Sequence, residues 1–417
     1  MFKRYQILAF LYFAMAIYVS ILRKPFVITI FDLTLLSVLF LDFGRLSFRS
    51  KIPTDKNLFR YLMTLLFMMI IHMDLAASLK EIIQMIEVYL FYIVLVSYLQ
   101  DSTHENSDIH QRFLKSFTNV IFIGLIVTFI NELFIINLGR NQLHFLAIPL
   151  MIISVLTFFY QSQIRIGILS NRFSASLIAF FALAVLFYEN SRAGLLFFVI
   201  FVSLLALQVK KRYLIPIVTL AVVAVSIFTY VQDVTQTEAY MSVGYSNDGR
   251  LIYKENLSVR ATRGLGSIQV ILENLDTIWD FITAPDQGIL TENIYGSNYE
   301  RLFQVKYVYQ AFMNSPIIGL GPNNAAEIAN VHGIILVTIA DFGLIGIGIL
   351  TLYIINSYRK LRVISRTKEL YDMFLFYYFI YSLIVLAFVS AGLLPLIPFI
   401  FVSTLIHIRY HALLFSK

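Results

Sequence analysis

Apolar runs long enough to cross a membrane recur along almost the whole chain, and one polar segment, from about residue 232 to about residue 330, interrupts them. The 417 residues are 59% hydrophobic and only 14% charged, a balance that ordinary soluble domains do not show. A helix needs about 20 apolar residues to cross the hydrocarbon core of a bilayer. The sequence therefore predicts an all-α membrane protein with one large, partly helical segment outside the membrane.

We expect about twelve transmembrane helices on that length scale. The first is expected to be retained, because no small-residue cleavage site follows it. The expected helices give three regions: residues 1–231 with about nine spans, a large loop at 232–332, and residues 333–417 with about three spans. The spans are placed at residues 5–22, 26–43, 58–73, 82–99, 117–137, 141–160, 173–188, 194–208, 213–231, 333–356, 372–389 and 392–408.

The basic residues predict the orientation of these spans. Most of the 32 Lys and Arg residues fall in the connections that this topology places on one side, and the side richer in them is normally cytoplasmic. Both termini are then cytoplasmic and the large loop is extracytoplasmic. The net charge of +7 reflects this asymmetry and is spread over many short connections, so nucleic acid is not an expected partner.

Two residue patterns are missing from the chain. It has no cysteine, which excludes disulfides, thiolate metal sites and a cysteine nucleophile. It also has no Asp-x-Asp pair, which nucleotide-sugar transferases commonly use to hold a divalent metal on a leaving diphosphate. We therefore expect no metal site and no cofactor, and any leaving-group charge must be balanced by arginines and helix N-termini.

The end of the polar segment predicts a helix that leads into a turn. Ser297 and Glu300 form a capping box, and Pro316 and Gly319 end the helix. Its expected apolar stripe is Leu302, Val305, Tyr309 and Phe312. A second helix is expected from about 267 to 281, with Ile268, Ile271, Leu275 and Trp279 on one face, and residues 241–249 are expected to be a loop.

Arg192 follows Asn190 and Ser191 at the outer start of an inward-running span. The first N–H groups of such a helix and its positive dipole end face outward, and an added arginine makes a site for a phosphate or diphosphate. An alternative role for Arg192 is that of an interfacial anchor.

Other basic residues lie in or next to the large loop. Arg301 opens the capped helix, and Arg260 and Arg263 are three residues apart, which places them on one face of a helix. His332 stands at the outer start of the following span and could act as a general base or as a donor to a departing phosphate oxygen. The simpler alternative is that these arginines and Lys306 are solvated and that the histidine is an amphipathic interfacial residue.

Three acidic residues, Asp32, Glu87 and Asp341, fall inside expected spans. Ionisable residues within the membrane are usually functional. Asp341 follows His332 by nine residues and could help to shape the same site. These acids also keep open a proton-coupled transporter as an alternative function.

The region from Glu300 to Gly346 resembles the O-antigen ligase and polymerase superfamily, whose members are bacterial multi-span glycosyltransferases. The family pattern is an Arg-led helix, a Pro-x-x-Gly-x-Gly turn, a His, and an acidic residue with Gly-x-x-Gly in the next span. Here these elements read Arg301, Pro316 to Gly321 with Gly319 and Gly321, His332, and Asp341 to Gly346, and Ser191-Arg192-Ala193-Gly194 resembles the upstream Ser-Arg element. Gly333 follows His332 where the family often has Asn, and the family's acidic residue is often Glu.

The resemblance implies an enzyme of the bacterial cytoplasmic membrane that acts on a sugar chain carried by undecaprenyl diphosphate. Arg192, Arg301 and Arg260 or Arg263 would stabilise the leaving diphosphate, and His332 would bind a phosphate oxygen or relay the acceptor proton. Gly319, Gly321 and Asp341 would help to form the substrate site. The transfer would be a single inverting displacement. Besides the lipid bilayer and the lipid-linked substrate, a chain-length regulator and a flippase of the same pathway are implied partners.

Four functions follow from this reasoning. The first is a repeat-unit polymerase for O-antigen or capsule, and the second is the ligase that transfers finished chains to lipid A core. The third is a lipid-linked oligosaccharide flippase or another transporter, which inverted repeats and charges deep in several spans would favour. The fourth is an envelope scaffold, in which the Arg and His positions would be free to vary.

Overall fold

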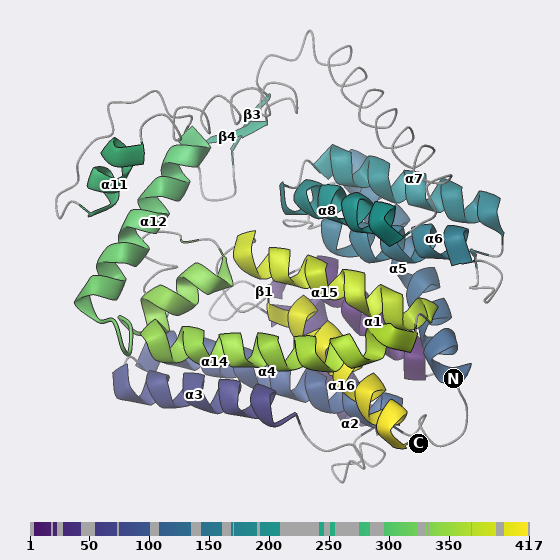
Figure 1. Cartoon of the computed structure of the whole chain (residues 1–417), viewed down its shortest axis with the longest axis horizontal. Coiled ribbons are helices and arrows are strands. Elements are labelled where there is room, and N and C mark those ends of the chain that lie inside the picture. The colour runs from purple at the N-terminus through teal and green to yellow at the C-terminus, as the bar shows by residue number, and fades with distance from the viewer. Residues whose placement is uncertain are drawn as a thin grey trace.

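The computed structural model describes the chain with gaps. The described residues are 4–17, 20–22, 28–42, 55–72, 75–100, 108–134, 143–160, 168–169, 171–189, 192–208, 242–245, 251–254, 275–283, 296–322, 331, 333–367, 369–388 and 396–415. Helices dominate these residues (Figure 1). They are α1 (Arg4–Ile17), α2 (Ile30–Asp42), α3 (Lys56–His72), α4 (Leu75–Gln100), α5 (Asp108–Phe134), α6 (His144–Tyr160), α7 (Arg172–Glu189), α8 (Arg192–Gln208), α11 (Leu275–Thr283), α12 (Gly296–Asn314), α14 (Ile334–Ile364), α15 (Leu370–Phe388) and α16 (Leu396–Phe415), with a 3-10 turn at Ser365–Thr367.

The expected all-α membrane class is confirmed in its coarse form. A helix lies at each expected span except 213–231, which falls outside the described residues. Among the described residues, five helical stretches are long and apolar enough to cross a membrane, and the count of twelve stays a prediction. These stretches are Ile82–Leu99, His110–Asn131, Ile334–Thr367, Leu370–Ala387 and Leu396–Leu414.

Helices α15 and α16 form the centre of the bundle. They pack against each other, α14 packs against both, and α4 and α6 contact α16 and α15 respectively. The hydroxyl of Tyr12 in α1 donates to the carbonyl oxygen of Phe145 in α6 at 2.8 Å and lies 2.5 Å from the hydroxyl of Tyr378 in α15. Partners of this kind satisfy buried hydroxyls and fix how the helices sit against one another.

Two ion-pair clusters join the helices toward the C-terminal end of α16. Lys360 in α14 lies 2.9 Å from Asp55, which precedes α3, and 2.7 Å from the ring of His407 in α16. Arg409 in α16 donates at 2.9 Å to Asp372 in α15, whose side chain is fully buried. Pairing is what makes such buried charges tolerable.

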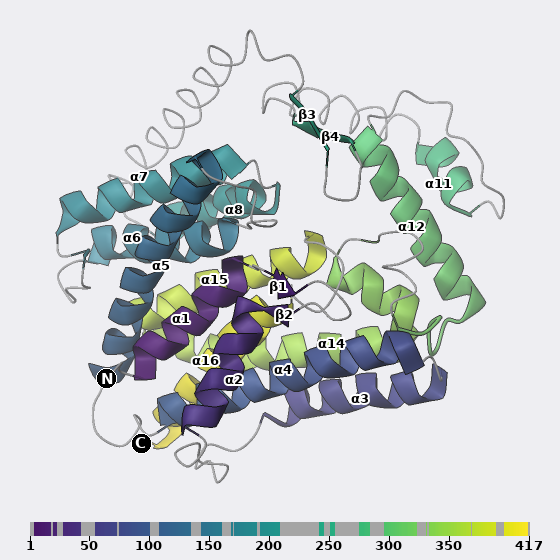
Figure 2. The same ribbon diagram turned by 180° about the vertical axis from the view of Figure 1, so that it is seen from behind.

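Both chain termini lie at one end of the helices, and α11 and α12 lie at the opposite end, as Figures 1 and 2 show. Helix α12 runs across that end and contacts α14 on one side and α11 on the other. The side of the membrane that each end faces stays a prediction.

The structure corrects the expected loop at residues 241–249. Strand β3 (Ser242–Tyr245) pairs antiparallel with β4 (Leu251–Lys254), and a second small pair joins β1 (Ser20–Leu22) to β2 (Ile28–Thr29). The sequence carried a hairpin signal that the loop interpretation ignored. Asp248-Gly249 is a favoured pair in hairpin loops, and it lies between two short runs that contain apolar residues, 243–245 and 251–253.

The helix expected from residue 297 is confirmed as α12, but part of its expected apolar stripe is wrong. Val305 is 36% exposed, whereas Gln304 and Lys306 are each only 3% exposed. The ammonium group of Lys306 lies 4.4 Å from the centre of the Phe281 ring in α11, so a cation–π contact buries a residue that the sequence suggested was solvated. The side chain of Ser297, the expected cap, lies outside the described residues.

The second expected helix, α11, is confirmed from residue 275 onward, but it buries the other face. Leu275 and Trp279 are 56% and 60% exposed, and Ile278, Phe281 and Ile282 are buried against α12. Both sets have helical spacing, so the sequence alone offered two stripes. Packing on α12 decides between them.

Candidate functional site

The Pro-x-x-Gly-x-Gly turn follows α12 and precedes α14 in the chain. It packs into a break within α14. Gly343 has φ 58° and ψ −151°, which is not helical. The N–H groups of Leu344 and Ile345 therefore lose their carbonyl partners four residues earlier and donate instead to Pro316 and Ile317, at 2.9 and 3.2 Å. Figure 1 shows the first turns of α14 at an angle to the rest of the helix.

The carbonyl groups freed by the same break are also satisfied by the turn. Ala340 accepts from the N–H of Leu320 at 2.9 Å, and Asp341 accepts from the N–H of Gly321 at 3.0 Å. Four hydrogen bonds thus replace the missing rungs of the helix. These bonds satisfy the N–H groups of Leu344 and Ile345 and the carbonyl groups of Ala340 and Asp341, so the break can persist in a buried part of the bundle.

Glycine is required on both sides of this joint. Gly319 has φ +71°, and a Cβ there would lie 2.3 Å from the backbone of Asp341. Gly343 has φ +58°, and a Cβ there would lie 2.7 Å from the backbone of Pro316 and Ile317. Positive φ and close backbone approach each favour glycine. We call residues 315–322 and 340–345 together the turn–kink joint.

His72, the last residue of α3, holds the turn from the other side. Its ring nitrogen Nε2 lies 3.1 Å from the carbonyl oxygen of Ile318, and a Cβ on Gly321 would lie 2.9 Å from its ring. His72 is not among the candidate residues predicted from the sequence. No local pattern marks it, because its partners lie about 250 positions later in the chain.

Helix α14 begins at Ile334, nine residues before the break at Gly343, without a side-chain cap. Gly333 precedes its first residue and has φ 92°, and a Cβ there would lie 2.3 Å from the carbonyl oxygen of Ala387 in α15. This contact accounts for glycine at a position where the family often has asparagine. The start of α14 offers free N–H groups and the positive end of the helix dipole, which favour an anion.

Residues 177–351 match the family model described as O-antigen ligase. The match begins within α7, ends within α14, and contains the whole turn–kink joint. This region, 175 of the 417 residues, is similar to the O-antigen ligase family. No curated protein matches the chain.

This similarity points to glycosyl transfer as the general class of activity and directs attention to the expected site residues. Gly319, Gly321 and Asp341 meet in the turn–kink joint, where Asp341 is fully buried. The structure shows Arg192 only as the first residue of α8, and its side chain is not described. His332, Arg260 and Arg263 lie outside the described residues, although Val331 and Gly333, the neighbours of His332, are buried.

Arg301 lies in α12, away from the joint. Thirteen residues separate it from the end of the helix at Asn314, which corresponds to roughly 20 Å along the axis. Its side chain is half-buried, and its Nη1 lies 3.5 Å from Oε1 of Gln304, one turn further along. A site that uses both Arg301 and the turn must therefore extend along α12, as a site for a long lipid-linked glycan would.

Tyr307 adds a polar group that the sequence analysis missed. It lies in α12 among residues that pack on α14, and its buried hydroxyl has no hydrogen-bond partner among the described residues. Burial, and to a smaller extent the carboxylate of Asp341, raises the pKa of Tyr307. The phenol therefore stays protonated at neutral pH and can donate a hydrogen bond to a phosphate or sugar oxygen.

Tyr307→Phe is expected to lower the rate of glycosyl transfer about fivefold, which corresponds to roughly 1 kcal/mol for one hydrogen bond to substrate. The same change removes a buried hydroxyl without a described partner, so the thermal unfolding midpoint should stay the same or rise. Initial rates and midpoints of the purified variant test this. A full wild-type rate would mean that the hydroxyl does not touch the substrate.

Metal binding can be judged only within the described residues. There, no group of three or more His, Asp or Glu side chains is arranged to hold a metal ion.

Asp32, one of the three acids that suggested a transporter, accepts hydrogen bonds from the N–H and the hydroxyl of Thr29 at 2.6 and 2.8 Å. It therefore stabilises the start of α2, as acidic residues in a first turn commonly do.

Proposed function

We propose that the protein is a polysaccharide repeat-unit polymerase of the bacterial cytoplasmic membrane. Its donor is an oligosaccharide on undecaprenyl diphosphate, and its acceptor is a sugar hydroxyl of a second lipid-linked chain. The observation that carries the proposal is the turn–kink joint within the O-antigen ligase region, which holds the break in α14 against the turn that follows α12. A chain-length regulator and a flippase are the proposed partners.

The chemistry is a single displacement at the donor's anomeric carbon. The acceptor oxygen forms the new glycosidic bond as the bond from carbon to the diphosphate oxygen breaks, so the configuration inverts. The lipid diphosphate leaves with added negative charge, and the acceptor hydroxyl gives up its proton. Arg301, Arg192 and the N–H groups at the start of α14 stabilise the leaving charge, with Arg260 or Arg263 as further contacts. His332 binds a phosphate oxygen or takes up the proton.

This assignment of charges needs no metal ion. Arginine matches the geometry of phosphate oxygens with two parallel N–H donors, and helix N-termini add N–H groups that are already oriented. Arg301 supports the assignment because its guanidinium is half-buried and oriented by Gln304. A partly desolvated cation of this kind acts more strongly on a developing charge than a fully solvated one.

The ligase is the second candidate, because the matching family model is described as O-antigen ligase. The two activities differ in the acceptor. A ligase transfers the glycan to lipid A core, whereas a polymerase transfers it to another lipid-linked chain and needs no lipid A core.

The purified protein, supplied only with lipid-linked repeat units, is expected to make a ladder of longer lipid-linked chains. A gel of the labelled products measures this, in parallel reactions with and without lipid A core. Transfer that occurs only with lipid A core would assign the ligase. No transfer in either reaction, with a folded protein, would contradict glycosyl transfer from this donor.

A further inference from the structure

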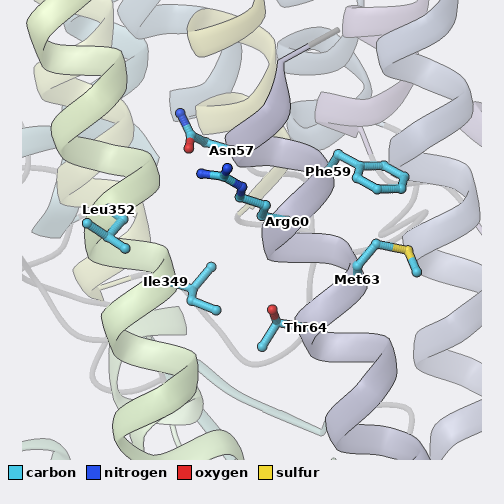
Figure 3. A pocket seen from close by; sticks show the side chains of 7 residues that line it. All are labelled: Asn57, Phe59, Arg60, Met63, Thr64, Ile349 and Leu352. Atoms are coloured by element: carbon cyan, nitrogen blue, oxygen red, sulfur yellow. The ribbon is translucent and has the colours of Figure 1, made fainter.

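A groove of about 350 Å³ lies between α3 and α14, on the part of the bundle nearer the start of α3 (Figure 3). Its walls are mostly apolar, but three polar side chains of α3 enter it. The lining residues are Asn57, Phe59, Arg60, Met63, Thr64, Ile349 and Leu352.

The groove opens on an exposed apolar surface of the bundle, which we expect to face lipid. Phe59, Met63 and Phe67 of α3 are 47%, 45% and 61% exposed, and Leu352 of α14 is 62% exposed. A continuous apolar surface of this kind on a membrane bundle faces acyl chains and not water. The occupant of the groove is therefore expected to be partly apolar.

Among the residues that the structure describes, none supplies a counter-charge to Arg60. It makes no hydrogen bond or ion pair with any residue that the structure describes. Asp55, the acid one turn before it, is already paired with Lys360 at 2.9 Å and lies 3.6 Å from the ring of His407. An arginine at a lipid-facing position needs an anion, and lipid phosphates supply one.

The polar and apolar parts of the groove are arranged like those of a phospholipid. Arg60 and Asn57 are three residues apart and share a face of α3, and Figure 3 shows both side chains extending to the same side, toward Leu352. They lie in the first turns of α3, whereas Met63 and Ile349 line the rest of the groove. Lys56 and Arg359, both exposed, add positive charge at the same end.

We propose that this groove binds an anionic phospholipid from the leaflet on the side where the chain termini lie. Arg60 and Asn57 donate hydrogen bonds to the phosphate, and an acyl chain lies along Met63, Ile349 and Leu352. The site is separate from the turn–kink joint, and the proposal does not depend on the proposed polymerase activity. Lipid bound there bridges α3 and α14, the two helices that hold the turn.

The test uses the full-length protein reconstituted in nanodiscs with equal amounts of phosphatidylglycerol and phosphatidylcholine. After extraction into detergent, native mass spectrometry counts the retained lipids. Arg60→Gln is expected to retain phosphatidylglycerol about tenfold more weakly, because a charge-assisted pair is lost. Arg366→Gln, at an exposed arginine outside the groove, is the matched control and should behave like the wild type. Equal retention by Arg60→Gln and the wild type would overturn the proposal.

Two further measurements separate a lipid from a soluble anion and from a folding defect. Leu352→Trp fills the groove from an exposed position, keeps Arg60, and should also weaken retention. Inorganic phosphate at millimolar concentration should not displace the lipid, because it lacks the acyl chain. Displacement by phosphate, or wild-type retention in Leu352→Trp, would show that the groove does not bind a lipid. Thermal midpoints of the variants in lipid-free detergent should equal that of the wild type.

Discussion

A Gly343→Ala variant is expected to lose the turn–kink joint and with it glycosyl transfer. The alanine would have to adopt φ +58°, which costs about 1–3 kcal/mol. Its Cβ would also lie 2.7 Å from the backbone of Pro316 and Ile317, and relieving that overlap costs about another 1–3 kcal/mol. The overlap is with backbone, so no side-chain rotation can remove it.

The same helix provides a matched control. A Cβ on Gly348 would meet nothing within 4 Å, so Gly348→Ala should be neutral or should stabilise the protein by roughly 0.5–1 kcal/mol. Thermal unfolding in detergent and the amount of polymer made in cells lacking the native gene measure both variants. If Gly343→Ala unfolds at the wild-type temperature and supports full-length polymer, the break in α14 is not what holds the turn.

Most of the helical architecture could be predicted from the sequence, because apolar length is a local signal. The motif residues Gly319, Gly321 and Asp341 were also identified, and they do meet. The contact that brings them together could not be predicted. Gly321 and Asp341 are joined by a backbone hydrogen bond at a break in α14, and nothing in the local sequence pattern indicates that this helix is broken. His72 was not predicted for a related reason: it is distant from the turn in the sequence, and the fold brings the two together.

The polar segment was harder to predict than the spans. Lys306 was counted among solvated basic residues, but its contact with the Phe281 ring comes from the packing of α11 on α12. Trp279 and Leu275 were expected on one apolar face of the helix, and both are exposed. Where a short helix carries two apolar stripes, the stripe that is buried is the one that packs against the adjacent helix. The relation between Arg301 and the turn likewise depends on how α12 lies across the bundle.

An Arg301→Ala variant is expected to transfer glycan about a hundredfold more slowly, while its folding is unchanged. Removing one preorganised donor to a developing charge costs roughly 3 kcal/mol of barrier. Arg301→Lys should recover only part of the rate, because lysine keeps the charge but lacks the two-pronged donor geometry. Arg362→Ala removes an exposed arginine from the far part of α14 and should leave the rate unchanged.

Steady-state kinetics with the lipid-linked donor distinguish the role of Arg301 from simple donor binding. If its guanidinium acts on charge that develops as the diphosphate leaves, kcat should fall while KM for the donor changes little. If it only holds the ground-state diphosphate, KM should rise while kcat stays the same. A wild-type rate in Arg301→Ala would remove Arg301 from the mechanism. Its place some 20 Å along α12 from the turn would then mark the glycan path and not the reacting bond.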